Sequence, residues 1–158
     1  MKRRTMLTAA AVALPLGAFV SAAAAQTMKS VAGTYAPVTA EVFGDKPRGL
    51  LTLGADGRYS VILARAKLNK IAADARTKGT ADENKMVVEG TIAHFGKYTI
   101  DDGGKTITFH IETSTYPNWD GSTQKRGLKV SGDTLAYVVA APSTGGGKPT
   151  ELVWRRVQ

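Results

Sequence analysis

Residues 94–121, HFGKYTIDDGGKTITFHIETSTYPNWDG, decide the fold of this chain. Two runs of alternating apolar and polar residues flank the sequence Asp101-Asp102-Gly103-Gly104, and such an arrangement is typical of a β-hairpin. We expect a two-residue turn with positive φ at both Gly103 and Gly104, which places Asp102 opposite Lys105. An irregular, aromatic-rich corner follows the second strand.

The turn fixes the expected pairing of the two strands. The opposed pairs are Ile100 with Ile107, Tyr98 with Phe109, Lys97 with His110, Gly96 with Ile111, and Phe95 with Glu112. Because side chains alternate between the faces of a strand, His94 joins the apolar face, whereas His110 and Glu112 share the other face. The two histidines therefore cannot hold one metal ion, and the chain has no cysteine. We expect neither a metal site nor a cofactor.

The rest of the chain predicts an all-β protein. Short runs of β-type residues recur between turn residues, which is typical of an antiparallel sandwich or barrel. Eight strands are expected, at Gly33–Thr39, Gly49–Leu53, Arg58–Ala64, Thr91–Ile100, Lys105–Thr115, Thr123–Val130, Thr134–Ala140 and Thr150–Val157. Residues 66–88 have few turn signals, and Ala81–Val88 is expected to form a short helix. We expect this insertion to cover one end of the barrel.

The first 25 residues have the pattern of an export signal. Lys2, Arg3 and Arg4 precede the mostly apolar segment Leu7–Val20, and Ala23–Ala25 offers a cleavage site before Gln26. The apolar segment is short for a membrane span, although a retained anchor is the alternative. Arg3 and Arg4 fit the twin-arginine route, and the general secretory route stays equally open. A periplasmic or secreted protein without stable membrane insertion is expected, with one domain at residues 26–158.

The charge of the chain is moderately basic. The formal net charge is +8, and three of these charges belong to Lys2, Arg3 and Arg4. The remaining basic residues are spread along the chain without a run of five like charges, so nucleic-acid binding is not expected. A mild preference for anionic ligands or for an anionic membrane surface is consistent with this balance.

The candidate ligand-binding residues are Tyr98, His110, Glu112, Trp119 and Arg126. His110 and Glu112 form a titratable cluster suited to binding or acid–base chemistry if their face lines the interior; if that face meets water, they are ordinary surface residues. The corner at Tyr116–Trp119 either plugs the barrel or contacts a ligand. His94 on the apolar face is expected to be a core residue.

Several segments, taken in order, resemble a bacterial family of lipocalin-like domains. They are Gly33–Tyr35, Pro47–Thr52 with Asp56–Arg58, Phe95–Tyr98, Thr108–Glu112, Pro117–Gly121 and Leu152–Val157. The resemblance covers nearly all of the chain after the signal. It implies a closed up-and-down barrel of eight strands with a possible ligand cavity. In lipocalins a Trp of a Gly-x-Trp motif is covered by an Arg, and here Tyr35 with Arg155 or Arg156 takes this place as the closure of the barrel end.

Three functions follow as hypotheses. The first is a periplasmic protein that binds a small hydrophobic or amphipathic molecule in the barrel. The second is a cofactor-free enzyme of the isomerase, cyclase or hydrolase type that uses His110 and Glu112. The third is a structural or envelope-stress protein whose barrel is filled by side chains. The state of the barrel interior distinguishes them.

Overall fold

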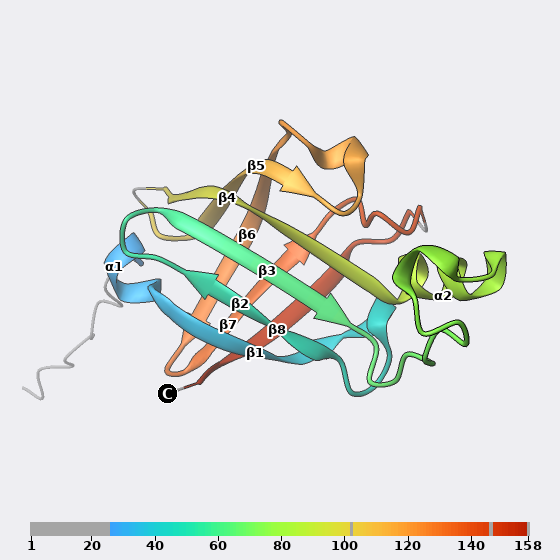
Figure 1. Ribbon diagram of the computed structural model, residues 1–158. Helices are drawn as coiled ribbons and strands as arrows, with labels where there is room; N and C mark the ends of the chain where they lie inside the picture. Colours follow the sequence, from blue (N-terminus) through green and yellow to red (C-terminus); the bar gives the residue numbers. More distant parts are fainter. Residues whose placement is uncertain (1–25, 102, 146, 158) are drawn as a thin grey trace, which may run out of the picture.

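The computed structural model describes residues 26–101, 103–145 and 147–157. The expected signal segment, residues 1–25, and Asp102 of the expected turn lie outside the described residues. Eight antiparallel strands form a closed barrel in which each strand pairs with its neighbours in sequence and the first pairs with the last (Figure 1). The strands are β1 Gly33–Ala40, β2 Arg48–Leu53, β3 Arg58–Ala64, β4 Thr91–Ile100, β5 Thr106–Ser114, β6 Thr123–Ser131, β7 Thr134–Val139 and β8 Thr150–Val157. The expected fold class and strand number are confirmed.

Short helical segments lie at the two ends of the barrel (Figure 1). They are α1 Met28–Val31, η1 Glu41–Phe43, η2 Arg76–Lys78, α2 Ala81–Gly90 and η3 Pro117–Trp119. Within the part of the chain that the structure describes, no helix is both long enough and apolar enough to cross a membrane.

The β4–β5 hairpin has the expected register near its turn. Ile100 pairs with Ile107, Tyr98 with Phe109, Lys97 with His110 and Gly96 with Ile111. The expected form of the turn is wrong, because Gly104 has a positive φ of 66° whereas Gly103 does not. The Asp101 carboxylate stabilises the turn by accepting hydrogen bonds from the backbone N–H groups of Lys105 and Thr106, at 2.8 and 3.0 Å.

A β-bulge changes the register at the other end of this hairpin. Phe95 pairs with Thr113 and His94 with Ser114, so the expected pairing of Phe95 with Glu112 is wrong. The bulge adds one residue to β5, which makes Glu112 and Thr113 both exposed and turns Ser114 inward. Gly96 sits at this point because the strands approach closely: a Cβ there would lie 2.1 Å from the carbonyl oxygen of His110.

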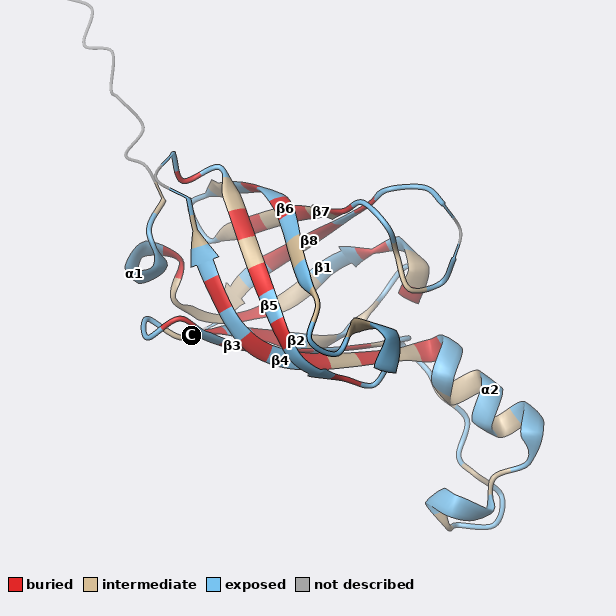
Figure 2. Cartoon of the chain, turned by 90° about the horizontal axis from the view of Figure 1, so that it is seen from above, coloured by how far each residue is buried: buried red, intermediate tan, exposed pale blue. Residues whose placement is uncertain are grey.

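The core fills the barrel interior, and along most strands buried residues alternate with exposed or half-buried ones (Figure 2). Its largest fully buried side chains are aromatic: Trp154, Tyr35, Tyr98, Tyr137 and Phe109. Burying a large apolar side chain contributes roughly 1.5–3 kcal/mol relative to exposing it. These aromatic side chains therefore both stabilise the barrel and occupy most of its interior.

One end of the barrel is closed by α1. Thr27 caps this helix. The Tyr35 hydroxyl donates a hydrogen bond to the carbonyl of Val31, the buried residue of the helix, at 2.6 Å. Tyr98 adds a second contact at this end, since its hydroxyl donates to the carbonyl of Gly54 at 2.8 Å. The closed end is thus held by buried tyrosine hydroxyls that pair with backbone carbonyls.

The other end carries η1, α2 and the β7–β8 loop. Thr80 and Glu83 form a capping box at the start of α2, and Glu83 also accepts a hydrogen bond from the backbone N–H of Ala72 at 2.8 Å. The expected helix at Ala81–Val88 is confirmed and runs two residues further. It lies at the barrel end but projects away from it, so the expectation that it covers that end is wrong (Figure 2).

Candidate ligand-binding site

An arginine in the barrel interior is the central feature of the candidate site. Arg126 lies on β6 in phase with Leu128, and the alternation of that strand turns both side chains inward. Only 4% of Arg126 is exposed. Arginine is almost never buried to this extent without a partner. The groups around Arg126 therefore indicate which kind of ligand the interior can bind.

Aromatic rings surround the Arg126 guanidinium. Its central carbon lies 4.9 Å from the ring centre of Phe109, 5.0 Å from that of Tyr137 and 6.0 Å from that of Trp119. These distances are those of cation–π contacts, which contribute about 0.5–2 kcal/mol each. Three rings thus hold the cation in place and offset part of the cost of burying it.

The Nε donor of Arg126 is buried without a polar partner. Nη2 donates to the side-chain oxygen of Gln124 at 2.7 Å, whereas the buried Nε has no hydrogen-bond partner. Among the described residues the ion pairs are Lys85–Glu89 and Lys129–Glu151, both at the surface. Arg126 is therefore a buried positive charge without a carboxylate partner in the described part of the chain. Burial lowers the pKa of its guanidinium, but arginine keeps its charge in proteins.

A histidine and a tyrosine form a second polar pair in the interior. His94 on β4 lies with its Nδ1 atom 2.8 Å from the hydroxyl oxygen of Tyr59 on β3. Burial, and secondarily the charge of Arg126, lowers the pKa of His94 to about 3. Burial also raises the pKa of the Tyr59 hydroxyl. The pair is therefore neutral at ordinary pH, and Arg126 carries the charge.

Arg126 and His94 face a narrow cavity that continues to the barrel mouth. The cavity has a volume of about 50 Å³, and its lining includes His94, Trp119, Arg126 and Tyr137. A hollow of about 680 Å³ lies outside it, against the end of α2. The cavity and the hollow share four lining residues, Phe43, Ile92, Ser143 and Thr144. The mouth of the barrel therefore leads from the hollow toward Arg126.

The structure separates the residues expected from the sequence to form the site. Trp119 and Arg126 line the same cavity. Tyr98 is buried near the closed end, where its hydroxyl bonds to backbone carbonyls. His110 and Glu112 lie on the outer face of β5 and are exposed, so of the two positions that the sequence left open for their face, the structure shows the one that meets water. The apolar face that carries His94 forms the core, as expected, and His94 also lines the cavity.

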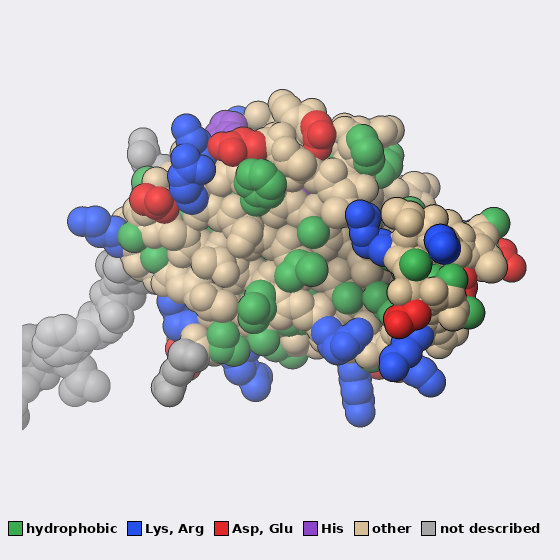
Figure 3. Space-filling model, viewed as in Figure 1, with side chains coloured by type: hydrophobic (Ala, Val, Ile, Leu, Met, Phe, Trp, Pro, Cys, Tyr) green, Lys and Arg blue, Asp and Glu red, His purple; other side chains and the backbone are tan. Residues whose placement is uncertain are grey.

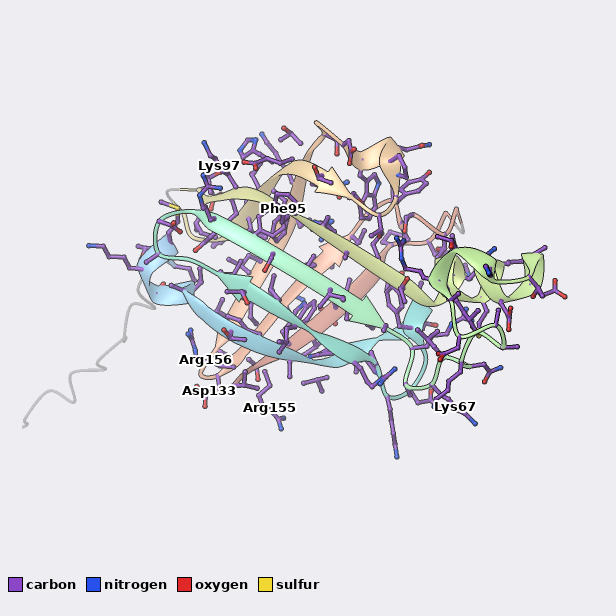
Figure 4. The ribbon with its side chains drawn as sticks, in the orientation of Figure 1. Lys67, Phe95, Lys97, Asp133, Arg155 and Arg156 are labelled. Atoms are coloured by element: carbon purple, nitrogen blue, oxygen red, sulfur yellow. The ribbon has the colours of Figure 1, made fainter. Side chains whose placement is uncertain are left out.

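The closure residues lie together at the opposite end of the barrel. The Arg156 guanidinium carbon lies 4.8 Å from the ring centre of Tyr35, and Arg156 also donates hydrogen bonds to the carbonyls of Ala32 and Ser30. Arg155 is exposed and does not take part (Figure 4). Of the two arginines left open by the sequence, Arg156 is the one that covers the aromatic ring.

Sequence reasoning missed Tyr59 and Tyr137 as site residues. Both follow the inward phase of their strands, Tyr59 with Val61 and Leu63, and Tyr137 with Leu135. The period-two pattern therefore gave their direction. It did not show that they lie near Arg126, because the three residues come from three different strands, β3, β7 and β6, of the closed barrel.

Apolar side chains are exposed on one face of the outer surface of the barrel (Figure 3). Large apolar side chains that are exposed on neighbouring strands include Leu50, Ile62 and Phe95, and green side chains gather on this face in Figure 3. Lysine and arginine side chains lie mainly around the edges of the same view. The described part of the chain holds no group of three or more His, Cys, Asp or Glu residues placed to share a metal ion.

Comparison with known proteins gives two matches. The family model described as lipocalin-like domain matches residues 25–157. A curated protein of Aspergillus oryzae, 4'-hydroxy-3'-methoxypropiophenone carrier protein ppsC, is 30% identical over 87 residues, which cover 50% of this chain and 78% of that protein. No solved structure matches the chain significantly.

Proposed function

The chain belongs to the lipocalin-like domain family, and from this premise we propose that it binds and carries a small, partly aromatic molecule whose polar end enters the barrel. The observation that carries the proposal is the buried Arg126, which faces the cavity with one donor unpaired and no carboxylate partner among the described residues. A buried charge that lacks a partner is costly. A ligand that supplies an acceptor oxygen offsets this cost. Ligand binding therefore explains why an arginine is buried at this position.

The dimensions of the mouth favour a ligand that is narrow at one end. Sites for small molecules usually have volumes of about 300–1,000 Å³, so the inner cavity is too small to enclose such a molecule. The outer hollow falls within that range. We propose that a polar substituent reaches Arg126 while the remaining ligand lies in the hollow, against Phe43 and Tyr116.

The curated relative supports a choice of ligand class. Its name describes a carrier of an aromatic ketone with hydroxyl and methoxy groups. Such a molecule has a flat apolar ring, which suits the aromatic and aliphatic lining, and oxygen atoms that can accept hydrogen bonds from Arg126. We therefore propose aromatic ketones and phenols as the first ligands to test.

Isothermal titration calorimetry with 4'-hydroxy-3'-methoxypropiophenone tests the proposal. We expect binding to the wild-type protein and an affinity about tenfold or more weaker in Arg126→Gln, because a hydrogen bond to a charged group contributes about 1.5–3 kcal/mol. Lys125→Gln is the matched control, since Lys125 precedes Arg126 on the same strand but is exposed. Absence of binding across a series of aromatic ketones and phenols, or equal affinities in the three proteins, would contradict the proposal.

The structure bears differently on the two alternative functions, the enzyme and the filled barrel. The enzymatic hypothesis relied on His110 and Glu112, and their place on the outer face removes that basis. The filled-barrel hypothesis is favoured by the aromatic side chains that leave a cavity of only about 50 Å³. The same calorimetric series distinguishes it from ligand binding, because a filled barrel takes up none of these compounds.

We also propose that the protein works in the periplasm or outside the cell. The support is the order of basic, apolar and small residues in the first 25 positions. N-terminal sequencing of the exported protein should give a start near Gln26. An intact Met1 on a membrane-bound protein would contradict this proposal. Replacing Arg3 and Arg4 by lysine should block export only if the twin-arginine route is used.

A further inference from the structure

We propose that the barrel holds its ligand as an oxyanion attached to an aromatic ring, with Arg126 as its counter-ion, and that a bound phenol is thereby ionised. This inference rests on the proposed function and specifies the chemical form in which the ligand is bound. The shared chemistry is an aryl oxyanion, which a phenol or an aromatic carboxylic acid can supply.

The balance of charge in the interior is the first support. The titratable groups around the cavity come from four strands: Tyr59 on β3, His94 on β4, Arg126 on β6 and Tyr137 on β7. Burial raises the pKa of both tyrosines, and His94 is neutral, so Arg126 gives this group of residues a net positive charge. Glu112 lies on the outer face of β5, and its charge makes only the smallest contribution to the raised pKa of Tyr59.

The contacts of Arg126 are the second support. The faces of Phe109, Tyr137 and Trp119 stabilise the cation, and Gln124 supplies one neutral acceptor oxygen. None of these groups neutralises the charge. Because the low dielectric of a buried site strengthens attraction between opposite charges, an oxyanion gains more at this position than a neutral carbonyl oxygen does.

The surrounding surfaces select for an aromatic oxyanion. Apart from the polar groups already named, the cavity is lined largely by apolar side chains, including Phe43, Ile92 and Val139. A flat ring can lie against these side chains, whereas a small hydrated anion loses its water without compensation. The ligand therefore combines an apolar ring with a single charged oxygen group.

Ionisation of a bound phenol leaves every atom accounted for. The phenolic O–H bond breaks, the electron pair stays on oxygen, and the proton passes to the solvent buffer. His94 does not retain the proton, because its imidazole stays neutral down to a pH of about 3. Binding of a phenol at a pH below its solution pKa should therefore release protons, whereas binding of its methyl ether should not.

Absorbance spectroscopy of 4'-hydroxypropiophenone with the exported protein tests the inference. The phenolate of such a ketone absorbs at longer wavelength than the phenol, so the bound form is read directly. We expect the acid dissociation constant of the bound phenol to rise by about 10- to 1,000-fold, the range produced by an opposite charge at close distance. The methyl ether, 4'-methoxypropiophenone, is the control that cannot ionise. A comparison of the affinities for benzoate and for the neutral benzamide tests whether a carboxylate can take the place of the phenolate.

The variants separate the charge of Arg126 from its shape. Arg126→Gln should abolish the phenolate band and the preference for benzoate, whereas Arg126→Lys should keep part of both. Lys125→Gln, which removes an exposed charge from the same strand, should behave as the wild type. If Arg126→Gln does not fold, the pH titration of the wild-type complex still tests the inference, because it measures the acid dissociation constant of the bound phenol directly.

The outcomes distinguish this inference from the proposed function. A phenolate band or a preference for benzoate that depends on Arg126 supports binding of the ligand as an oxyanion. Which of the two is observed shows whether the ligand is a phenol or a carboxylic acid. Calorimetric binding of the ketones without a phenolate band and without a preference for benzoate overturns the inference but leaves the carrier function intact. If no probe binds by calorimetry, both the inference and the proposed function fail.

Discussion

Nδ1 of His94 lies 2.8 Å from the hydroxyl oxygen of Tyr59, across the β3–β4 pair and inside the barrel. His94 is 6% exposed, and burial is the main cause that lowers its pKa to about 3. A neutral imidazole can accept a hydrogen bond from the hydroxyl at Nδ1. The same pair therefore satisfies two buried polar groups and makes the fold sensitive to acid.

The pH dependence of stability follows from this pair. In the unfolded chain His94 has an ordinary pKa of about 6.5, so between about pH 6.5 and 3 the unfolded state binds the proton that the folded state does not. The stabilisation is fully present above pH 6.5 and is lost as the pH falls through this range, by up to about 4 kcal/mol. Urea unfolding of wild type and His94→Gln at a series of pH values should show a smaller acid loss in the variant.

His110→Gln provides the matched control for this experiment. His110 is exposed on the outer face, with Nδ1 3.2 Å from the Thr123 hydroxyl oxygen. We expect this variant to lose stability with acid as the wild type does. Equal pH profiles for wild type and His94→Gln would show that His94 is protonated in the folded state.

Tyr35 should contribute more through its ring than through its hydroxyl. Tyr35→Ala removes a fully buried ring under the Arg156 guanidinium and should cost about 3–5 kcal/mol in the free energy of unfolding. Tyr35→Phe loses the hydrogen bond to Val31 and should cost about 1 kcal/mol, or somewhat more because the Val31 carbonyl loses a partner. Equal losses in urea unfolding would assign the role to the hydroxyl instead.

Substitution of Gly96 should test the bulge. In Gly96→Ala the new Cβ meets the carbonyl oxygen of His110 and the backbone nitrogen of Glu112, so the two strands must separate. We expect a loss of about 2 kcal/mol or more in chemical unfolding. Gly127→Ala is the control, because no atom lies within 4 Å of the Cβ position there, and it should change stability by less than about 0.5 kcal/mol. Similar losses in both variants would contradict a tight approach at Gly96.

The bulge also shows where sequence reasoning stops. The alternation of Ile107, Phe109 and Ile111 predicted which face of β5 is buried, and the structure confirms it. Beyond Ile111 the sequence Glu112-Thr113-Ser114 has no apolar residue to mark the inward position. The change of phase at the bulge therefore left no signal in the pattern, and Ser114 could not be assigned to the interior.

The candidate site was partly predictable for a similar reason. The strand bounds of β3, β4 and β8 agree with the sequence-based expectation because turn residues or changes of periodicity mark them clearly. The phase of Arg126 with Leu128 also indicated its inward direction. Arg126 was a candidate together with His110 and Glu112, but it lies in the interior whereas they lie on the outer face. The aromatic cage that holds Arg126 depends on barrel closure, which no local pattern describes.

Arg126 should reduce the stability of the protein while it serves binding. Its guanidinium is buried with Nε unpaired, and aromatic faces and Gln124 offset only part of the desolvation cost. Because a buried charge without a partner costs free energy, Arg126→Met, which places an apolar side chain of similar length there, should unfold at a higher urea concentration than the wild type. The variant should also lose affinity for 4'-hydroxy-3'-methoxypropiophenone. Lys125→Met, on the exposed side of the same strand, should change neither property. A strong destabilisation of Arg126→Met with unchanged binding would show instead that the arginine serves the fold, through its packing against Phe109 and Tyr137.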